Sequence, residues 1–480
     1  MSENRRLSLV LTLVAAQLVV MMDSSILNVA LPSIAEDLNL SATATAWVLN
    51  AYFLTFGGLL LVSGRAADIV GRRRMFLAGA AVLTVGSVVG ALAADEVTLI
   101  CARLLQGAGA AMLSPAAMSV ILARFTGEDR TRTMSWWGAA STVGGALGVT
   151  VGGILTGSFG WNSVMVVTAA FSAAILLAGW AMLPVDEKGS RRSFDATGAS
   201  LLTVAAVAVV YAVLAAPHAG LVSPEVIVAA LAAVGAGVAF VLVERRASDP
   251  ILPPSALRDA RVSGGIVVNM LGGAARIACF VLVALLIQQV LLYAPAVAGL
   301  AMLPTSLAGF AVSTLVLPRV LRRFGPEKVV LAGLGMLVVA HLLFASIDVG
   351  APYIWRVLPV LILAATGVAF SFTPTTLVIA DGMAARNAGV SSGLASATAQ
   401  IGGAIGIAVF GAANAAAYAA TVDAGGTSAA AVDAGLAAAH LAAAGSAAAA
   451  MVIAVLTFPA LRITGAARRR AGQARPADPR

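Results

Sequence analysis

The chain has 480 residues, of which 60% are hydrophobic and only 11% are charged, and its net charge is +8. A soluble protein carries about 25% charged residues, so most of this chain is expected to lie in a lipid bilayer. The positive charge does not indicate a nucleic-acid partner, because the basic residues form short clusters between apolar runs, as membrane topology requires. The two cysteines, Cys101 and Cys279, lie inside apolar runs and predict neither a disulfide framework nor a metal site.

Fourteen apolar stretches approach the length of about 20 residues that a helix needs to cross a bilayer. Their approximate ranges are 8–31, 46–63, 75–94, 98–122, 135–158, 162–183, 197–216, 225–243, 262–290, 297–317, 328–347, 355–379, 387–415 and 438–461. If the N-terminus is inside, only Arg103, Arg276 and Arg356 of the 30 basic residues lie off the inner side. By the positive-inside rule, and with an arginine and alanine bias typical of GC-rich bacteria, we expect a multi-pass protein of the bacterial cytoplasmic membrane with both termini in the cytoplasm.

Two charged loops, 184–196 and 244–261, divide these spans into groups of six, two and six. We therefore expect an all-α membrane protein with a six-helix bundle over 1–185 and a second one over 261–462. The linker 186–260 would hold two inserted transmembrane helices, and 463–480 would form a basic cytoplasmic tail. The Ala- and Gly-rich tract 415–437 is expected to be a flexible outer loop without chemistry.

The first span contains Asp23, the only carboxylate that falls deep inside a predicted span. An acid there costs roughly 2.5–3.5 kcal/mol on insertion scales and is by default a candidate functional residue. At about 1.5 Å per residue, Asp23 lies about 21 Å from the inner start of its span, at a depth similar to that of Arg103 on the fourth span. Because a lone buried charge is far costlier than a paired one, we predict that the two face each other as a proton-coupling pair. A purely structural ion pair is the alternative.

Polar side chains on spanning helices tend to line water rather than lipid. Several of them follow one helical face of the first span or accompany Arg103 on the fourth. They predict a substrate cavity that contains Gln17, Ser24, Asn28, Gln106, Ser114 and Gln288.

Arg276, in the ninth span, is the third buried charge. It either shares Asp23 or faces the cavity unpaired, where it would suit an anionic or zwitterionic substrate. Snorkelling, or packing against backbone carbonyls, is the alternative. Four tryptophans near span ends are expected to be interface anchors: Trp136, Trp137, Trp161 and Trp355.

The sequence contains no pattern for ATP-driven or enzymatic chemistry. A P-loop needs G-x-x-x-x-G-K-[ST], yet the only lysines, Lys188 and Lys328, each follow a glutamate. The three histidines are scattered along the chain and predict no metal site, and no nucleophile–base pattern suggests an enzyme. We expect no cofactor, so uphill transport would have to use an ion gradient.

Glycine recurs at every fourth position of the fifth span, where it makes a flat face that lets another helix approach closely. The set is Gly144, Gly148 and Gly152, with Gly153 beside it. This is first a packing signal, and a role in a moving seam is an inference.

Three motifs resemble those of the major facilitator superfamily. Residues 64–74 resemble its signature loop between helices 2 and 3, with Gly64, Asp68, Gly71 and Arg72 at the motif positions. Residues 99–111, with Arg103, resemble its helix-4 motif, and residues 23–32 resemble the helix-1 motif of its fourteen-helix drug:proton antiporter branch. The layout of six, two and six helices agrees over the whole chain. The fifth span keeps the glycines of the antiporter motif but has Val149 where that motif has proline.

The resemblance implies two six-helix bundles that rock about a central cavity and export a small amphiphilic molecule in exchange for protons. It implies that Asp68 and Arg72 gate the cavity by a charge contact, and that Arg103 tunes proton uptake at the nearby acid. Two alternatives stay open: a proton-coupled or facilitated transporter of one specific metabolite, and a membrane receptor or assembly protein that transports nothing. The protein is expected to act as a monomer.

Overall fold

The computed structural model describes residues 3–185, 195–220, 223–246, 254–293, 295–348, 350–383 and 387–458. Within these ranges every regular element is a helix. Thirteen helices there are long and apolar enough to cross a membrane, and a shorter apolar helix, Thr197–Val213, lies where the seventh span was expected. The predicted all-helical membrane fold is confirmed.

The first six helices form the N-terminal bundle. They are α1 (Glu3–Asp37), α2 (Ala42–Val70), α3 (Arg72–Ala91), α4 (Glu96–Arg124), α5 (Gly127–Phe159) and α6 (Asn162–Met182). Local chemistry sets several of their ends, as at α4, where the Asp95 carboxylate accepts hydrogen bonds from the N–H and the hydroxyl of Thr98. These bonds stabilise the charged form and hold the pKa of Asp95 below its ordinary value.

The last helices form the C-terminal bundle, which repeats the packing of the first. Helix α10 packs on α15 and α16 as α1 packs on α5 and α6. Likewise, α13 packs on α14 and α16 as α3 packs on α4 and α6. The elements are α10 (Ala260–Leu285) with the π-helical turn η1 (Leu286–Val290), α11 (Pro295–Ala311) with η2 (Val312–Val316) and α12 (Leu317–Phe324), α13 (Pro326–Phe344), η3 (Tyr353–Val357) with α14 (Leu358–Asp381), α15 (Ala388–Asp423) and α16 (Ser428–Thr457).

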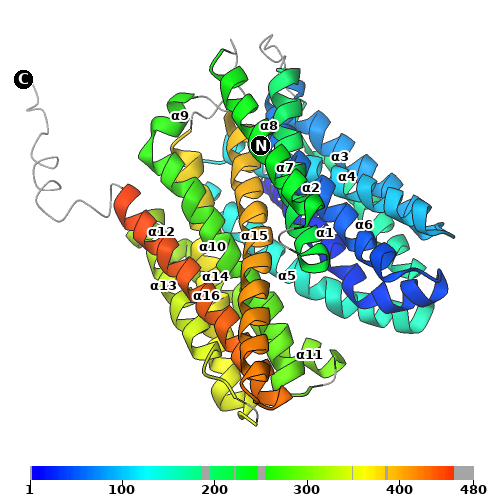
Figure 1. Cartoon of the computed structure of the whole chain (residues 1–480). Helices are drawn as coiled ribbons and strands as arrows, with labels where there is room; N and C mark the ends of the chain where they lie inside the picture. Colours follow the sequence, from blue (N-terminus) through cyan, green and yellow to red (C-terminus); the bar gives the residue numbers. More distant parts are fainter. Residues whose placement is uncertain are drawn as a thin grey trace, which may run out of the picture.

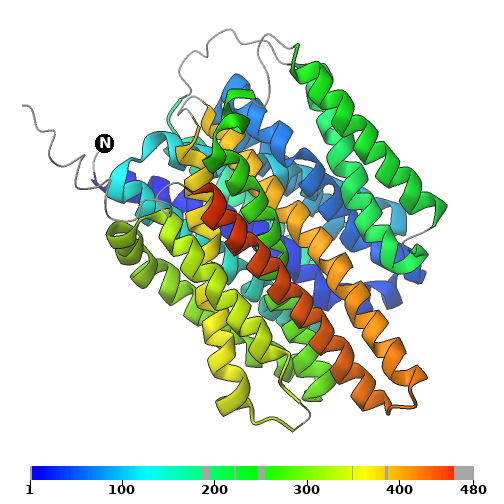
Figure 2. The ribbon, with the colours of Figure 1, turned by 60° about the vertical axis from the view of Figure 1, so that its left-hand side comes forward.

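Two further helices, α7 (Ala196–Ala219) and α8 (Pro224–Glu244), pack on each other, and α7 also contacts α2 and α15. Figure 2 shows this pair at the outside of the molecule. The short helix α9 (Pro254–Arg258) leads into the C-terminal bundle. The predicted tail 463–480 and the start of the predicted linker 186–260 lie outside the described residues, so these boundaries stay predictions.

The expectation of a flexible loop at 415–437 is wrong. Helix α15 continues to Asp423, and α16 already begins at Ser428, with the Thr427 hydroxyl accepting a hydrogen bond from the N–H of Ala430. Alanine is the strongest helix former, so a tract rich in alanine extends the helices on both sides. Only a short turn separates them, and in it Gly425 takes a positive φ of 81° that favours glycine.

In Figure 1 the helices of the two bundles lean apart toward the bottom of the view. The opposite end, where α16 terminates, is where α2, α4 and α5 of the first bundle meet α14 and α15 of the second. We call this the basic end, because Arg72, Arg73, Arg74, Arg124 and Arg130 lie there. The polar contacts between the two bundles lie at this basic end.

Candidate functional site

Asp23 and Arg103 lie together in the interior of the N-terminal bundle, as their similar depths predicted. Both side chains are fully buried, and Arg103 Nη1 lies 3.5 Å from Asp23 Oδ2. The 3.5 Å separation is long for a charge-assisted hydrogen bond, which is typically about 2.7–2.9 Å. The contact therefore compensates both charges without locking the carboxylate to the guanidinium.

Arg103 is held in place mainly by groups other than Asp23. Its Nε donates to the carbonyl of Val48 at 3.1 Å, and its Nη1 donates to Gln106 Oε1 at 2.7 Å. Its guanidinium carbon also lies 4.4 Å from the centre of the Tyr52 ring, a favourable cation–π arrangement. The guanidinium can therefore keep its position when the charge of Asp23 changes.

Gln106 connects the ion pair to the neighbouring helix. Its Nε2 donates to Asp23 Oδ1 at 3.1 Å and to Ser87 Oγ on α3 at 2.8 Å, while its Oε1 accepts from Arg103. All of these side chains are buried. Ser87 was not singled out from the sequence, because one serine in an apolar span gives no signal of its own. The result is a buried polar cluster on α1, α3 and α4 around one acid.

The other predicted cavity residues are distributed over several environments. Gln17 forms a second buried cluster, since it accepts from Ser114 Oγ at 2.7 Å and donates to Ser141 Oγ on α5 at 2.9 Å. Ser24 donates to the Met21 carbonyl of its own helix, and Gln288 lies exposed on η1. The side chain of Asn28 lies outside the described residues. A role in substrate binding stays a prediction for all of them.

The glycine face of α5 packs against α1. A Cβ atom at Gly144 would lie 2.9 Å from Met21 Cβ, one at Gly148 would lie 2.6 Å from the Met22 carbonyl oxygen, and one at Gly152 would meet the Ile26 carbonyl. Gly153 has only an ordinary contact, at 3.5 Å from Val29. Since Ser25 also donates to the Gly145 carbonyl at 2.9 Å, α1 and α5 form one closely packed unit.

Asp68, at the end of α2, joins the two bundles. Its side chain is fully buried, and its carboxylate accepts hydrogen bonds from the backbone N–H groups of Gly389 at 2.9 Å and Val390 at 3.0 Å. These are first-turn N–H groups of α15, which otherwise have no partner within their helix, and the helix dipole favours an anion there. Asp68 therefore caps a helix of the opposite bundle.

The glycines of the same motif allow this approach. A Cβ atom at Gly64 would lie 2.9 Å from the Cα of Gly393 on α15, so the backbones touch. Gly71 separates α2 from α3 with a φ of 117°, a conformation that residues other than glycine rarely adopt. This turn places Arg72 beside Asp68.

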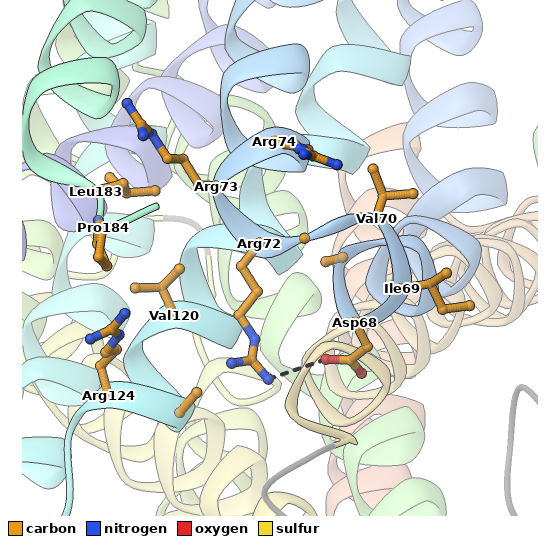
Figure 3. A pocket seen from close by; sticks show the side chains of 13 residues that line it. Asp68, Ile69, Val70, Arg72, Arg73, Arg74, Val120, Arg124, Leu183 and Pro184 are labelled. Atoms are coloured by element: carbon orange, nitrogen blue, oxygen red, sulfur yellow. Dashed lines mark hydrogen bonds and ion pairs between the residues drawn. The ribbon is translucent and has the colours of Figure 1, made fainter. Parts of the chain in front are cut away.

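Arg72 donates from Nη2 to Asp68 Oδ1 at 3.3 Å and from Nε to Ser119 Oγ on α4 at 2.8 Å. Figure 3 shows this contact at the edge of a pocket that Arg73, Arg74 and Arg124 also line. The motif residues predicted from the sequence are thus brought together at the basic end, and their gating role is taken up below.

Further contacts join the bundles at the basic end. Ser392 on α15 donates to the Pro115 carbonyl on α4 at 2.9 Å. Arg322 pairs with Glu128 at 2.9 Å, and Arg130 pairs with Asp381, on exposed surface. The expectation that Trp137 is an interface anchor is wrong: it is 1% exposed and stacks on Phe372 of α14 with ring centres 5.9 Å apart, because its face of α5 meets the other bundle.

Arg276 lies in the C-terminal bundle and bonds within its own helix. Its Nη2 donates to the side-chain oxygen of Asn269 at 2.8 Å and to the Asn269 carbonyl at 3.2 Å, and its guanidinium stacks on Phe372. Its Nη1 is buried and finds no hydrogen-bond partner in the described part of the chain. The arrangement matches packing against a backbone carbonyl, whereas Asp23 is bonded by Arg103 and Gln106.

Two of the three histidines, although far apart in the sequence, meet in the C-terminal bundle. His341 on α13 and His440 on α16 are both fully buried, with their Nδ1 atoms 3.0 Å apart. Positions 99 residues apart in the sequence come together because α13 packs against α16.

Residues 13–407 match the family model of the Major Facilitator Superfamily. The chain belongs to this superfamily. It is 35% identical over 422 residues to a puromycin resistance protein of Streptomyces alboniger, covering 87% of this chain and 84% of that protein. It is 35% identical over 402 residues to a cephamycin export protein of Amycolatopsis lactamdurans, covering 82% of each chain. The fold matches the human organic anion transporter MFSD10 with a TM-score of 0.68 at 16% identity, over 94% of this chain and 100% of that one.

As a Major Facilitator Superfamily member, the protein is a membrane transporter with a small-molecule substrate, and its family confirms the expectation that it is not an enzyme. The superfamily resemblance drawn from the motifs at 23–32, 64–74 and 99–111 is confirmed. Its many apolar helices make it a multi-pass protein of the membrane.

Proposed function

We propose that the protein exports amphiphilic small molecules in exchange for protons, with Asp23 as the proton carrier. The observation that carries the proposal is a fully buried carboxylate at the centre of a polar cluster in a family of transporters. Relatives named for resistance to puromycin and for export of cephamycin support the direction of transport. Their chemically unlike compounds favour a cavity that accepts more than one substrate.

The geometry around Asp23 explains how one proton could change the conformation. The ionised carboxylate accepts from Gln106 and lies beside Arg103, so it ties α1 to α4. When it is protonated, Arg103 still has the Val48 carbonyl and Gln106 Oε1, so the tie to α1 weakens and α4 keeps its own structure. Because α1 is packed closely on α5, the two helices would move together.

The basic end is assigned to the cytoplasm because its arginines follow the positive-inside rule. The contacts of Asp68 and Ser392 across the two bundles then hold the cytoplasmic end closed. In the proposed cycle, Asp23 takes a proton from outside, the cavity turns inward, the proton leaves and the substrate binds. The loaded transporter then turns outward. The protein acts as a monomer in the bacterial cytoplasmic membrane, with both termini in the cytoplasm.

A toxicity panel in an efflux-deficient bacterial host tests the proposal. Puromycin and cephamycin are applied at two external pH values to cells that express the wild type, Asp23→Asn or Glu36→Gln. Glu36 is a matched control, because it is an exposed acid near the end of the same helix. We expect wild type and Glu36→Gln to protect, more strongly at the lower external pH, and Asp23→Asn to give no protection at equal membrane expression. Protection by Asp23→Asn equal to that of the wild type would reject the proposal.

A further inference from the structure

His341 and His440 form a buried pair at the contact of α13 and α16, and α10 closes it from the third side. The Nε2 atom of His341 lies 3.0 Å from the Ala275 carbonyl and 3.5 Å from Cys279 Sγ, both on α10. The ring of Phe344 packs 5.2 Å from that of His440. His440 Nε2 is buried and has no hydrogen-bond partner among the residues that the structure describes. A buried polar atom of this kind calls for an explanation.

Hydrogen-bond chemistry fixes where the protons lie when both rings are neutral. A carbonyl only accepts, so His341 Nε2 carries the hydrogen that points to Ala275. A neutral imidazole has one donor and one acceptor, so His341 Nδ1 accepts and His440 Nδ1 donates. His440 Nε2 then carries no hydrogen and has a free lone pair. The neutral pair can therefore accept one more proton, and the atom that would accept it is Nε2 of His440.

The internal repeat of the fold gives an independent argument. Ser87 and His341 each lie fifteen residues after the first residue of their helix, in α3 and α13 respectively. Those two helices hold equivalent places in the two bundles, and Gly79 and Gly333, each seven residues into its helix, pack closely on α4 and α14 in the same way. His341 thus occupies the position in the C-terminal bundle that Ser87 of the Asp23 cluster occupies in the N-terminal one.

Two charged residues lie on the helices α10 and α16 that enclose the pair. Arg276 on α10, one helical turn from Cys279, disfavours a proton on the imidazoles. Asp433, two turns before His440, is the one acid on α16. A movement of α10 relative to α13 and α16 changes the distance from Arg276 to the pair, so the affinity of the pair for a proton would follow the position of α10.

We propose that His440, positioned by His341, is a second proton-binding site that loads and unloads during the transport cycle. The proposal deepens the proton coupling proposed above and rests on it for its role in transport. The added proton enters on Nε2 of His440, no bond to carbon changes, and the ring becomes an imidazolium. Nothing in the Asp23 cluster is required for that step.

Magic-angle-spinning NMR on the full-length protein, labelled with ¹⁵N at histidine and reconstituted in lipid, tests the proton binding directly. At about pH 8 we expect His341 to be protonated at Nε2 only and His440 at Nδ1 only, and on lowering the pH to about 4 we expect one ring to become an imidazolium. Two neutral rings with unchanged tautomers over this range would overturn the proposal. So would an imidazolium that persists at the higher pH. The result does not depend on transport, so it stands even if puromycin export proves to be uncoupled from protons.

The substitution His440→Asn separates the base from the hydrogen bond. The asparagine Nδ2 lies where the histidine Nδ1 was, so it can still donate to His341, but the basic Nε2 is gone. We expect the imidazolium signal to vanish and the pH profile of puromycin efflux to lose one titration step. Cys279→Ser, which changes a neighbour of the same pair without removing the base, should keep both. A wild-type pH profile in His440→Asn overturns the proposal, and if that variant does not fold, the NMR titration of the wild type still decides.

Discussion

Replacing Asp68 with asparagine should shift the transporter toward the conformation in which the basic end is open. In the wild type the carboxylate accepts the N–H groups of Gly389 and Val390 across the bundle interface. An asparagine oxygen can accept only one of them well, and its NH₂ group then faces the other donor. The substitution therefore removes at least one charge-assisted hydrogen bond and leaves a helix N-terminus of α15 without its anion.

The size of the shift follows from the geometry. A hydrogen bond to a charged group contributes about 1.5–3 kcal/mol, so a loss of about 2–3 kcal/mol changes the ratio of the two conformations about 30- to 150-fold. The ion pair with Arg72 is lost as well, but the arginine keeps its hydrogen bond to Ser119. An effect of this size changes the dominant conformation unless the closed state is favoured by much more.

Spin labels on Val70 and Phe324 report on this equilibrium, because both side chains are exposed at the basic end, one on each bundle. The labels are introduced after the exposed Cys101 and the buried Cys279 have been replaced with serine. Pulsed-dipolar distances in Asp68→Asn should show a longer component that is minor in the wild type. Glu128→Gln is the matched control, since it breaks the inter-bundle ion pair with Arg322. The side chains of Arg322 and Glu128 are 64% and 70% exposed, so this ion pair contributes little. A distance distribution of Asp68→Asn that coincides with that of Glu128→Gln would refute the reasoning.

Three further predictions concern stability and ionisation. Gly152→Ala should lower the melting temperature, because overpacking against α1 costs about 1–3 kcal/mol. Gly157→Ala, on the same helix, has open space around it and should leave the melting temperature unchanged. Equal melting temperatures of the two variants would contradict the packing argument. Arg276→Gln should melt at the same or a higher temperature, because a buried cation without an acidic partner is costly, and a clear fall in scanning calorimetry would contradict this. By NMR, the pKa of Asp95 should lie below its ordinary value and return toward it in Thr98→Val. Because folding lowers the pKa of Asp95, the ionised carboxylate stabilises the folded protein at pH values above the ordinary pKa of aspartate. This stabilisation is lost as the pH falls through the lowered pKa of Asp95.

Hydropathy and charge predicted the membrane fold because the bilayer imposes both the length of a span and the side on which arginines lie. The same reasoning failed at 415–437, where composition was taken as a sign of a loop. Alanine-rich sequence is compatible with either state, and here α15 and α16 extend into it.

The pairing of Asp23 with Arg103 could be predicted because depth along a helix can be read from the sequence, and burial demands a partner. The role of Ser87 could not, since it depends on α3 packing against α4. Trp137 was misjudged for a related reason: its distance from the span end is visible in the sequence, but the face that meets Phe372 is not.

Contacts between the bundles were the hardest to foresee. Asp68 and its partner Gly389 are 321 residues apart, and the motif resemblance implied only a charge contact of Asp68 with Arg72. His341 and His440 belong to no motif, and their meeting is a consequence of helix packing alone.

The most direct test of the account is uphill transport of puromycin in proteoliposomes with an imposed pH gradient, wild type against Asp23→Asn. The wild type is predicted to accumulate puromycin against its gradient, and the variant only to equilibrate it while still exchanging labelled for unlabelled puromycin. Accumulation by the variant at the wild-type level would contradict the claim that this buried carboxylate carries the coupling proton.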